Sequence, residues 1–181
     1  MEFNLKMAMF KPALKFAMER AGHGAALGFK LTRVGQGQAE MTFPYKEEVI
    51  GNPLTGVVHG GVIVSLLDTC CGCAAITVLD RRAITPTMDL RLDYMHPAEP
   101  KKPIFVSAKV YRNTANVIFC RGSAWQNDED NPIAHCVATF MKVDAEGMRF
   151  SDILRRRVNR LFGAISKPSK KDWRSPNDPR D

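Results

Sequence analysis

The sequence predicts an α+β fold in which an antiparallel sheet wraps around one long central helix. Residues 62–79 form a nearly continuous apolar run with Asp68 in its middle, which is long enough for a buried helix. Two strand-like runs precede this segment and four follow it, which gives a sheet of about five or six strands. A membrane span has a similar length, but a central carboxylate and Gly72 favour a helix covered by a sheet.

The segment before the central helix predicts a short helix and a hairpin. Apolar residues at helical spacing predict an amphipathic helix over about 12–21, with Gly22 as its stop. Two alternating runs, 27–34 and 39–43, are joined by a glycine-rich turn, which is typical of a β-hairpin. We expect residues 44–59 to form a loop that delivers the chain to the central helix.

The segment after the central helix predicts the rest of the sheet and an appendage. Proline-rich and asparagine-rich turns separate the expected strands, which are 83–95, 104–112, 116–126 and 133–143. Ser151 caps an expected helix that reaches residue 162, and the chain from 166 onward has a disordered composition. We therefore divide the chain into an N-terminal helix (1–24), one domain (25–147) and a basic C-terminal extension (148–181).

The positive charge belongs to that extension and not to the domain. The net charge is +7, and residues 149–181 hold ten Lys or Arg against four Asp or Glu, which leaves +1 for the rest. We interpret the extension as a solvated, solubilising end and expect no nucleic-acid partner. Contact with an acidic membrane surface is the alternative that this charge leaves open.

The five cysteines do not indicate a disulfide framework or a metal site. Their count is odd, three fall within 70–73, and no second Cys or His pair stands at ligand spacing. Small buried thiols in a reducing cytosol are the better interpretation, and lysines interrupt any secretory h-region near the N-terminus. We expect a cytoplasmic protein without metal or cofactor, since no phosphate loop or dinucleotide fingerprint is present.

The residues expected to act on a substrate lie in one segment, where the predicted loop meets the central helix. Residues 52–62 read Asn-Pro-Leu-Thr-Gly-Val-Val-His-Gly-Gly-Val, and Asp68 follows nine residues after the His. This pattern resembles the hotdog-fold acyl-CoA thioesterases of the 4-hydroxybenzoyl-CoA thioesterase-like superfamily, and more narrowly their phenylacetate-degradation-type branch. Segment 87–97 is similar to that family's strand after the helix, so the resemblance covers roughly 27–143. It implies a hotdog fold and hydrolysis of an acyl-CoA to a free acid and coenzyme A.

The physical chemistry of the junction agrees with that activity. Gly60 and Gly61 place amides at a helix N-terminus, where unpaired N–H groups and the helix dipole can hold a developing oxyanion. Asp68 is the acid available in this helix to attack the acyl carbon or to activate water, and both roles stay open. The alternative is a structural Asp without a catalytic role.

The spacing of these residues requires a second subunit. Gly60 and Asp68 lie eight residues apart, so a rise of ~1.5 Å per residue separates them by about 12 Å along one helix. That is too far for both to address one carbonyl. If both act, Gly60 of one copy must face Asp68 of another, so we expect a homodimer, or a dimer of dimers, with equivalent shared sites. The resemblance implies the same arrangement.

Three neighbours complete the predicted site. By resemblance, Asn52 orients the thioester or its water, and Thr87 holds the water beside Asp68. Asn52 lies seven residues before His59 where relatives often have six, and a turn-forming Asn-Pro is its alternative role. His59 assists near the thioester sulfur or fixes the loop by hydrogen bonds.

Four further residues are candidates for the phosphates of coenzyme A. Arg112 and Asn113 end an expected strand, and Arg81 and Arg82 follow the central helix. Solvated turn charges are the simpler interpretation of each. A non-catalytic acyl-CoA-binding or regulatory protein is the alternative function, whereas a hydratase is disfavoured because the helix lacks a His/Asp or His/Glu acid–base pair.

Overall fold

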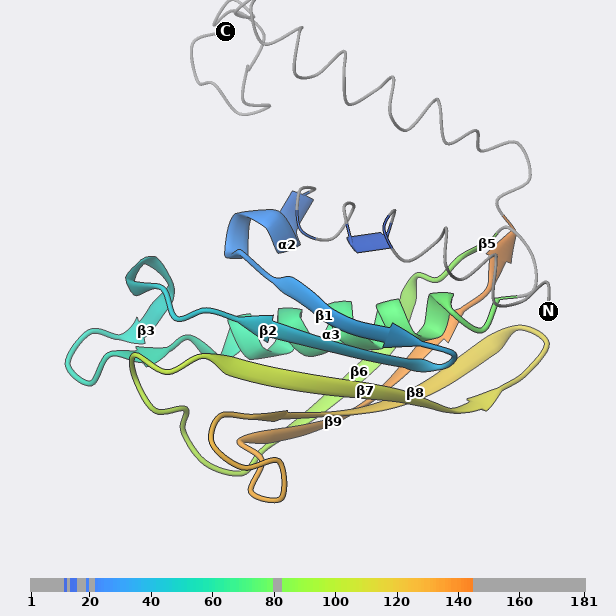
Figure 1. Cartoon of the computed structure of the whole chain (residues 1–181). Coiled ribbons are helices and arrows are strands. Elements are labelled where there is room, and N and C mark those ends of the chain that lie inside the picture. Colours follow the sequence, from blue (N-terminus) through green and yellow to red (C-terminus); the bar gives the residue numbers. More distant parts are fainter. Residues whose placement is uncertain (1–11, 13, 16–18, 20–21, 80–82, 145–181) are drawn as a thin grey trace, which may run out of the picture. The chain divides into compact units, whose positions relative to one another are not determined.

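The computed structural model describes residues 12, 14, 15, 19, 22–79 and 83–144. A six-stranded antiparallel sheet with the order β1-β2-β7-β8-β9-β6 forms its main layer, and helix α3 (Gly60–Ile76) packs against it (Figure 1). The strands are β1 (Lys30–Gly35), β2 (Gln38–Phe43), β6 (Thr87–Tyr94), β7 (Ile104–Asn113), β8 (Val117–Trp125) and β9 (Ala134–Met141). The predicted α+β class and the central helix are confirmed.

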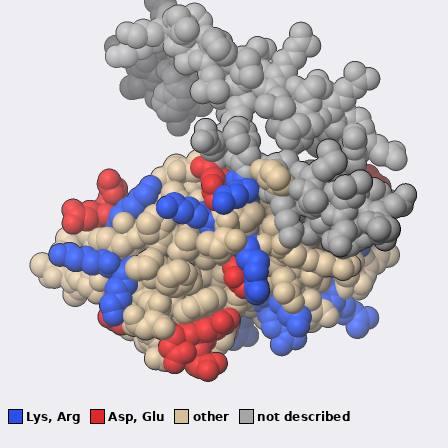
Figure 2. All heavy atoms as spheres, in the orientation of Figure 1, with Lys and Arg blue, Asp and Glu red and all other residues tan. Residues whose placement is uncertain are grey.

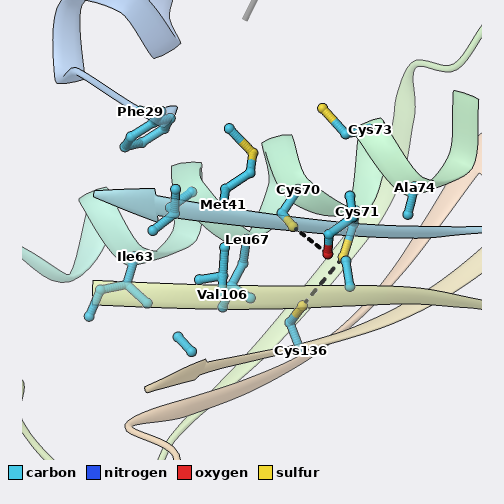
Figure 3. Close-up of a cluster of buried hydrophobic side chains, with 14 of the residues drawn as sticks. Phe29, Met41, Ile63, Leu67, Cys70, Cys71, Cys73, Ala74, Val106 and Cys136 are labelled. Atoms are coloured by element: carbon cyan, nitrogen blue, oxygen red, sulfur yellow. Dashed lines mark hydrogen bonds between the residues drawn. The ribbon is translucent and has the colours of Figure 1, made fainter. Parts of the chain in front are cut away.

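The core lies between α3 and the sheet. The sheet-facing side of α3 is buried, and alternate residues of β8 and β9 point toward it. Figure 3 shows Cys70 and Cys71 of α3 within this core, where the Cys71 Sγ lies 3.8 Å from the Sγ of Cys136 on β9. Burial raises the pKa of the Cys73 thiol to about 12. The cysteines are free and buried, which confirms that they pack as small apolar groups.

The N-terminal hairpin is present but starts later than predicted. Residues 22–27 form helix α2 (Gly22–Leu27), so the strand begins at Lys30 and not at residue 27. Gly22, the predicted stop, is the first residue of α2 and has a φ of +64°, a left-handed conformation that favours glycine. Of the helix predicted over 12–21, the described residues Pro12, Leu14, Lys15 and Glu19 are helical.

Three predicted segments differ from the structure in how they divide into elements. The expected loop 44–59 holds a 3₁₀ turn (Glu47–Val49) and the short pair β3 (Ile50–Asn52) and β4 (Val57–Val58). The expected strand 83–95 is divided into β5 (Ala83–Ile84) and β6, because Pro86 lies between them and has no N–H for a ladder. The last expected strand is likewise divided into β9 and β10 (Val143–Asp144), which pairs with β5.

The C-terminal end of α3 is fastened to the hairpin turn. The buried Thr77 hydroxyl donates to the Ala74 carbonyl at 2.7 Å and accepts the Gly37 N–H at 2.7 Å. The Thr77 hydroxyl and the Gly37 N–H therefore both have hydrogen-bond partners where the helix meets the turn between β1 and β2. This bond fixes the helix along the sheet and so fixes the position of the residues that α3 carries.

The surface of the described domain carries both signs of charge. Lysine and arginine side chains lie interspersed with aspartate and glutamate on the face shown in Figure 2. No helix of the described part of the chain is long and apolar enough to cross a membrane. The helix predicted from Ser151 and the basic extension lie outside the described residues.

Candidate active site

The N-terminus of α3 offers one free amide. His59 caps the helix, and its Nδ1 accepts the Gly61 N–H at 3.0 Å. The Val62 N–H bonds to the His59 carbonyl at 2.9 Å. Within the described residues the Gly60 N–H has no acceptor, so it remains the donor that can polarise a carbonyl. The Gly61 N–H is engaged by His59, and its predicted role in binding the substrate stays a prediction.

Close packing of β3 holds the cap in place. The His59 N–H bonds to the Val49 carbonyl at 2.9 Å. A Cβ on Gly51 would lie 2.7 Å from the His59 Cα, so only glycine allows β3 to approach this closely. His59 therefore fixes the loop through hydrogen bonds, which is one of the two roles predicted for it. Its acceptor Nδ1 places the ring proton on Nε2.

Asp68 lies two helical turns further along α3. Its side chain is half-buried, and the Thr87 hydroxyl donates to its Oδ1 at 2.9 Å. Among the described residues no other hydrogen bond to this carboxylate is formed, so it retains lone pairs for a substrate or a water molecule. The structure thus brings together the pair that the family resemblance implied.

A β-bulge places Thr87 on the correct face of β6. The register between β6 and β9 shifts between Thr87 and Asp89. Because successive side chains alternate across a strand, Thr87 and Tyr94, seven residues apart, would otherwise point to opposite faces. With the bulge, both contact α3, Thr87 at Asp68 and Tyr94 at Gly60.

Tyr94 is a site residue that sequence reasoning missed. Its hydroxyl donates to the Gly60 carbonyl at 2.8 Å, and a Cβ on Gly60 would lie 2.8 Å from that hydroxyl oxygen. Desolvation raises the pKa of Tyr94 above its usual value, so the hydroxyl keeps its proton. The phenol therefore holds the peptide between Gly60 and Gly61 at the start of the helix. An aromatic residue among the charged residues of this strand was the available signal.

Two cavities are lined in part by residues of α3. The first, which we name the Asp68 cavity, has a volume of about 230 Å³ and includes Asp68, Thr87 and Gly72 in its lining. The second, the His59 cavity, has a volume of about 380 Å³ and is lined by His59, Gly61 and residues of α2 and β3. Asp68 and the helix N-terminus thus open into separate cavities.

The remaining predicted residues lie elsewhere or act locally. The Asn52 Oδ1 accepts the Leu54 N–H at 3.0 Å, as in a turn-forming Asn, and its role toward a substrate stays a prediction. The Asn113 amide donates to the Val78 carbonyl at 3.3 Å, beyond the C-terminus of α3, and Arg112 beside it is exposed. Their contact with coenzyme A also stays a prediction. Arg81 and Arg82 lie outside the described residues.

Comparison with known proteins places this site in a family. The family model of the thioesterase superfamily matches residues 55–133, which include most of the junction, α3 and strands β4 to β8. A crystal structure of a Pseudomonas aeruginosa protein shares 45% sequence identity and a TM-score of 0.63, covering 71% of this chain and 95% of that one. The chain belongs to the thioesterase superfamily. It has the hotdog fold and is a thioesterase.

Two further relatives carry informative names. The medium/long-chain acyl-CoA thioesterase YigI of Escherichia coli is 29% identical over 129 residues, which is 64% of this chain and 82% of that protein. The Escherichia coli PaaI protein from the phenylacetic acid degradation operon shares 17% identity with a TM-score of 0.59, over 66% of this chain and 82% of that one. The second likeness concerns the fold. The narrower branch predicted from the sequence stays a prediction.

Proposed function

We propose that this thioesterase hydrolyses acyl-CoA thioesters to a free carboxylic acid and coenzyme A, at sites shared between two copies of the chain. The observation that carries the proposal is the Asp68 carboxylate, oriented by Thr87 at 2.9 Å and open to a cavity. The name of the Escherichia coli relative supports acyl-CoA as the substrate class. Free, buried thiols suit a reducing compartment and support a cytoplasmic location.

The chemistry follows from two positioned groups. The Gly60 N–H donates to the thioester oxygen and holds the negative charge that develops when the carbonyl carbon becomes tetrahedral. Asp68 either takes a proton from the attacking water or attacks the carbon itself, in which case water then hydrolyses the acyl–enzyme anhydride. In both routes the C–S bond breaks, and the departing thiolate gains the proton that water supplied. Thr87 positions the carboxylate in both.

The dimer is needed because one chain does not bring these groups together. Gly60 and Asp68 lie on one straight helix, eight residues or about 12 Å apart. Two groups that far apart cannot both contact one thioester carbonyl. An amide and a carboxylate that act on the same carbonyl must therefore come from two helices, and a second copy of this chain supplies the second helix.

The edge of the sheet supports a specific arrangement. Strand β6 is the last strand of the sheet, and its free edge carries the exposed side chains of Met88 and Tyr94. Two copies of β6 paired antiparallel about a two-fold axis near Leu90 would bring the Thr87 end of one strand beside the Tyr94 end of the other. Since Thr87 contacts Asp68 and Tyr94 contacts Gly60, this pairing would assemble two complete sites.

A thiol-release screen tests the proposed activity. We expect the purified protein to release free coenzyme A from at least one class in a panel of short, medium, long and aromatic acyl-CoA substrates, with turnover on the order of 1 s⁻¹ or faster. Isothermal titration with the same panel serves as the control. Acyl-CoA binding without thiol release from any substrate would contradict the proposal and favour a binding protein.

A further inference from the structure

The lining of the Asp68 cavity combines polar and apolar side chains. Asp68 and Thr87 form a hydrogen bond of 2.9 Å, and Thr69 and Thr85 are the other polar lining residues. The apolar lining side chains are Leu14, Cys73, Ile76 and Phe140, of which Leu14, Cys73 and Phe140 are buried. A cavity that offers both a carboxylate and apolar side chains suits a ligand with the same division, such as a carboxyl derivative of an alkyl chain.

Gly72 keeps this space open. Asp68, Gly72 and Ile76 follow at intervals of four residues and so form one row along α3. Without a side chain at Gly72, nothing on the helix separates the carboxylate from Ile76. A Cβ built at Gly72 would have the ring of Phe140 at 3.6 Å as its neighbour, which is ordinary contact distance. Packing therefore does not require a glycine here: a Cβ would contact the Phe140 ring without a clash, and a larger side chain would take up part of the Asp68 cavity that Gly72 lines.

The His59 cavity suits an alkyl chain less well. Its lining includes the ionisable side chains of His23, Glu48 and His59. The His23 Nε2 and the Ser65 Oγ lie 3.1 Å apart within it. An alkyl chain placed there would remove water from these polar groups without replacing their hydrogen bonds. Of the two cavities, the Asp68 cavity is the one that an acyl chain can fill at lower cost.

We propose that the Asp68 cavity holds the acyl chain of the substrate and that Gly72 and Ile76 set the chain length that is accepted. This inference rests on the proposed acyl-CoA hydrolysis. The acyl chain begins at the carbon on which Asp68 acts, so the cavity that starts at this carboxylate is in reach of it. The cavity has a volume of about 230 Å³.

This volume defines a substrate class. The cavity has room for several methylene groups beside the carboxylate, so a medium-length acyl chain fills more of it than a short one does. The expected kcat/KM rises about fourfold for each methylene that becomes buried, and it stops rising when the cavity is full. We therefore expect octanoyl-CoA to be a better substrate than butyryl-CoA and palmitoyl-CoA to gain nothing over octanoyl-CoA.

Substitutions of Gly72 test the assignment. Gly72→Val fills the cavity with three carbons and is expected to lower kcat/KM for octanoyl-CoA by at least about tenfold, with a change below about threefold for acetyl-CoA. The chain-length optimum should move to shorter chains. Gly72→Ala should move it less, and Ile76→Ala, which enlarges the cavity, should move it to longer chains. The matched control is Leu27→Ala, which enlarges the His59 cavity and should leave the optimum where it is.

The outcomes separate the two proposals. If the wild-type protein releases coenzyme A from no acyl-CoA, the proposed function itself fails. If it is active but Gly72→Val has the wild-type chain-length profile, or if Leu27→Ala moves the optimum, the acyl chain lies elsewhere and this inference is overturned. Circular dichroism and mass measurement verify that each variant is folded. If Gly72→Val does not fold, opposite shifts of the optimum in Gly72→Ala and Ile76→Ala support the inference, and unchanged optima overturn it.

Discussion

Asp68→Asn is expected to lower the kcat of thioester hydrolysis by at least about a hundredfold. The substitution removes the negative charge and the basic lone pairs that attack the acyl carbon or take the proton from water. It keeps the size of the side chain and an amide oxygen that can still accept the hydrogen bond from Thr87. Steady-state kinetics with the best acyl-CoA of the screen measures the loss. KM should change little, because binding does not need the charge.

A matched charge substitution controls this result. Asp130→Asn removes the same charge from an exposed position in the turn between β8 and β9, outside the site. It should retain wild-type kcat within about twofold, as surface substitutions commonly do. Urea denaturation of both variants verifies that stability is comparable. An Asp68→Asn enzyme that turns over at a near-normal rate would show that this carboxylate is structural.

Gly60→Pro is expected to lower kcat by about 100- to 1,000-fold, the usual cost of losing one oxyanion-hole donor. Proline has no N–H, so this substitution deletes the Gly60 amide, which bonds to no acceptor in the part of the chain that the structure describes. The backbone accepts it. Gly60 is the first residue of α3, where proline is common, and His59 has φ −60° and ψ 131°, which a residue before proline favours.

Gly60→Ala separates the effect of losing the amide N–H from the steric effect of an added Cβ. Both substitutions place a Cβ against the Tyr94 hydroxyl, which lies 2.8 Å away, so the tyrosine must move in both variants. Alanine keeps the N–H. The difference in kcat between the two variants therefore reports the donor alone. Equal activities of Gly60→Ala and Gly60→Pro would exclude the Gly60 amide from the reaction.

The central helix and most strands of the main sheet could be predicted because their patterns are long. α3 has buried residues along its whole length, β8 alternates over its nine residues, and β7 alternates up to the register shift before Arg112. The short strands β3 and β4 could not, because two or three residues carry no readable period. Helix α2 could not be predicted for the same reason, because it has only six residues and two of them are glycines.

The site was predictable in its residue types and less so in its contacts. The pattern from His59 to Asp68 pointed to the helix start and the carboxylate, and the family resemblance supplied Thr87. The capture of the Gly61 amide by His59 depends on a side-chain rotamer, and the contact between Tyr94 and Gly60 depends on a bulge in β6. The order of residues specifies neither contact, although an aromatic residue among the charged residues of β6 singles out Tyr94 itself. In the sequence, Gly72 was evidence against a membrane span. In the structure, it lines the Asp68 cavity.

The sharing of each site between two copies is tested most directly by combining two inactive variants. Asp68→Asn and Gly60→Pro, carrying different tags, are co-expressed, and the mixed dimer is isolated and verified by mass. One of its two sites then contains an intact Asp68 from one copy and an intact Gly60 from the other, so about half of the wild-type activity per dimer should return. If each chain formed its own site, both sites would carry a defect. A verified mixed dimer as inactive as its parents would contradict the shared site.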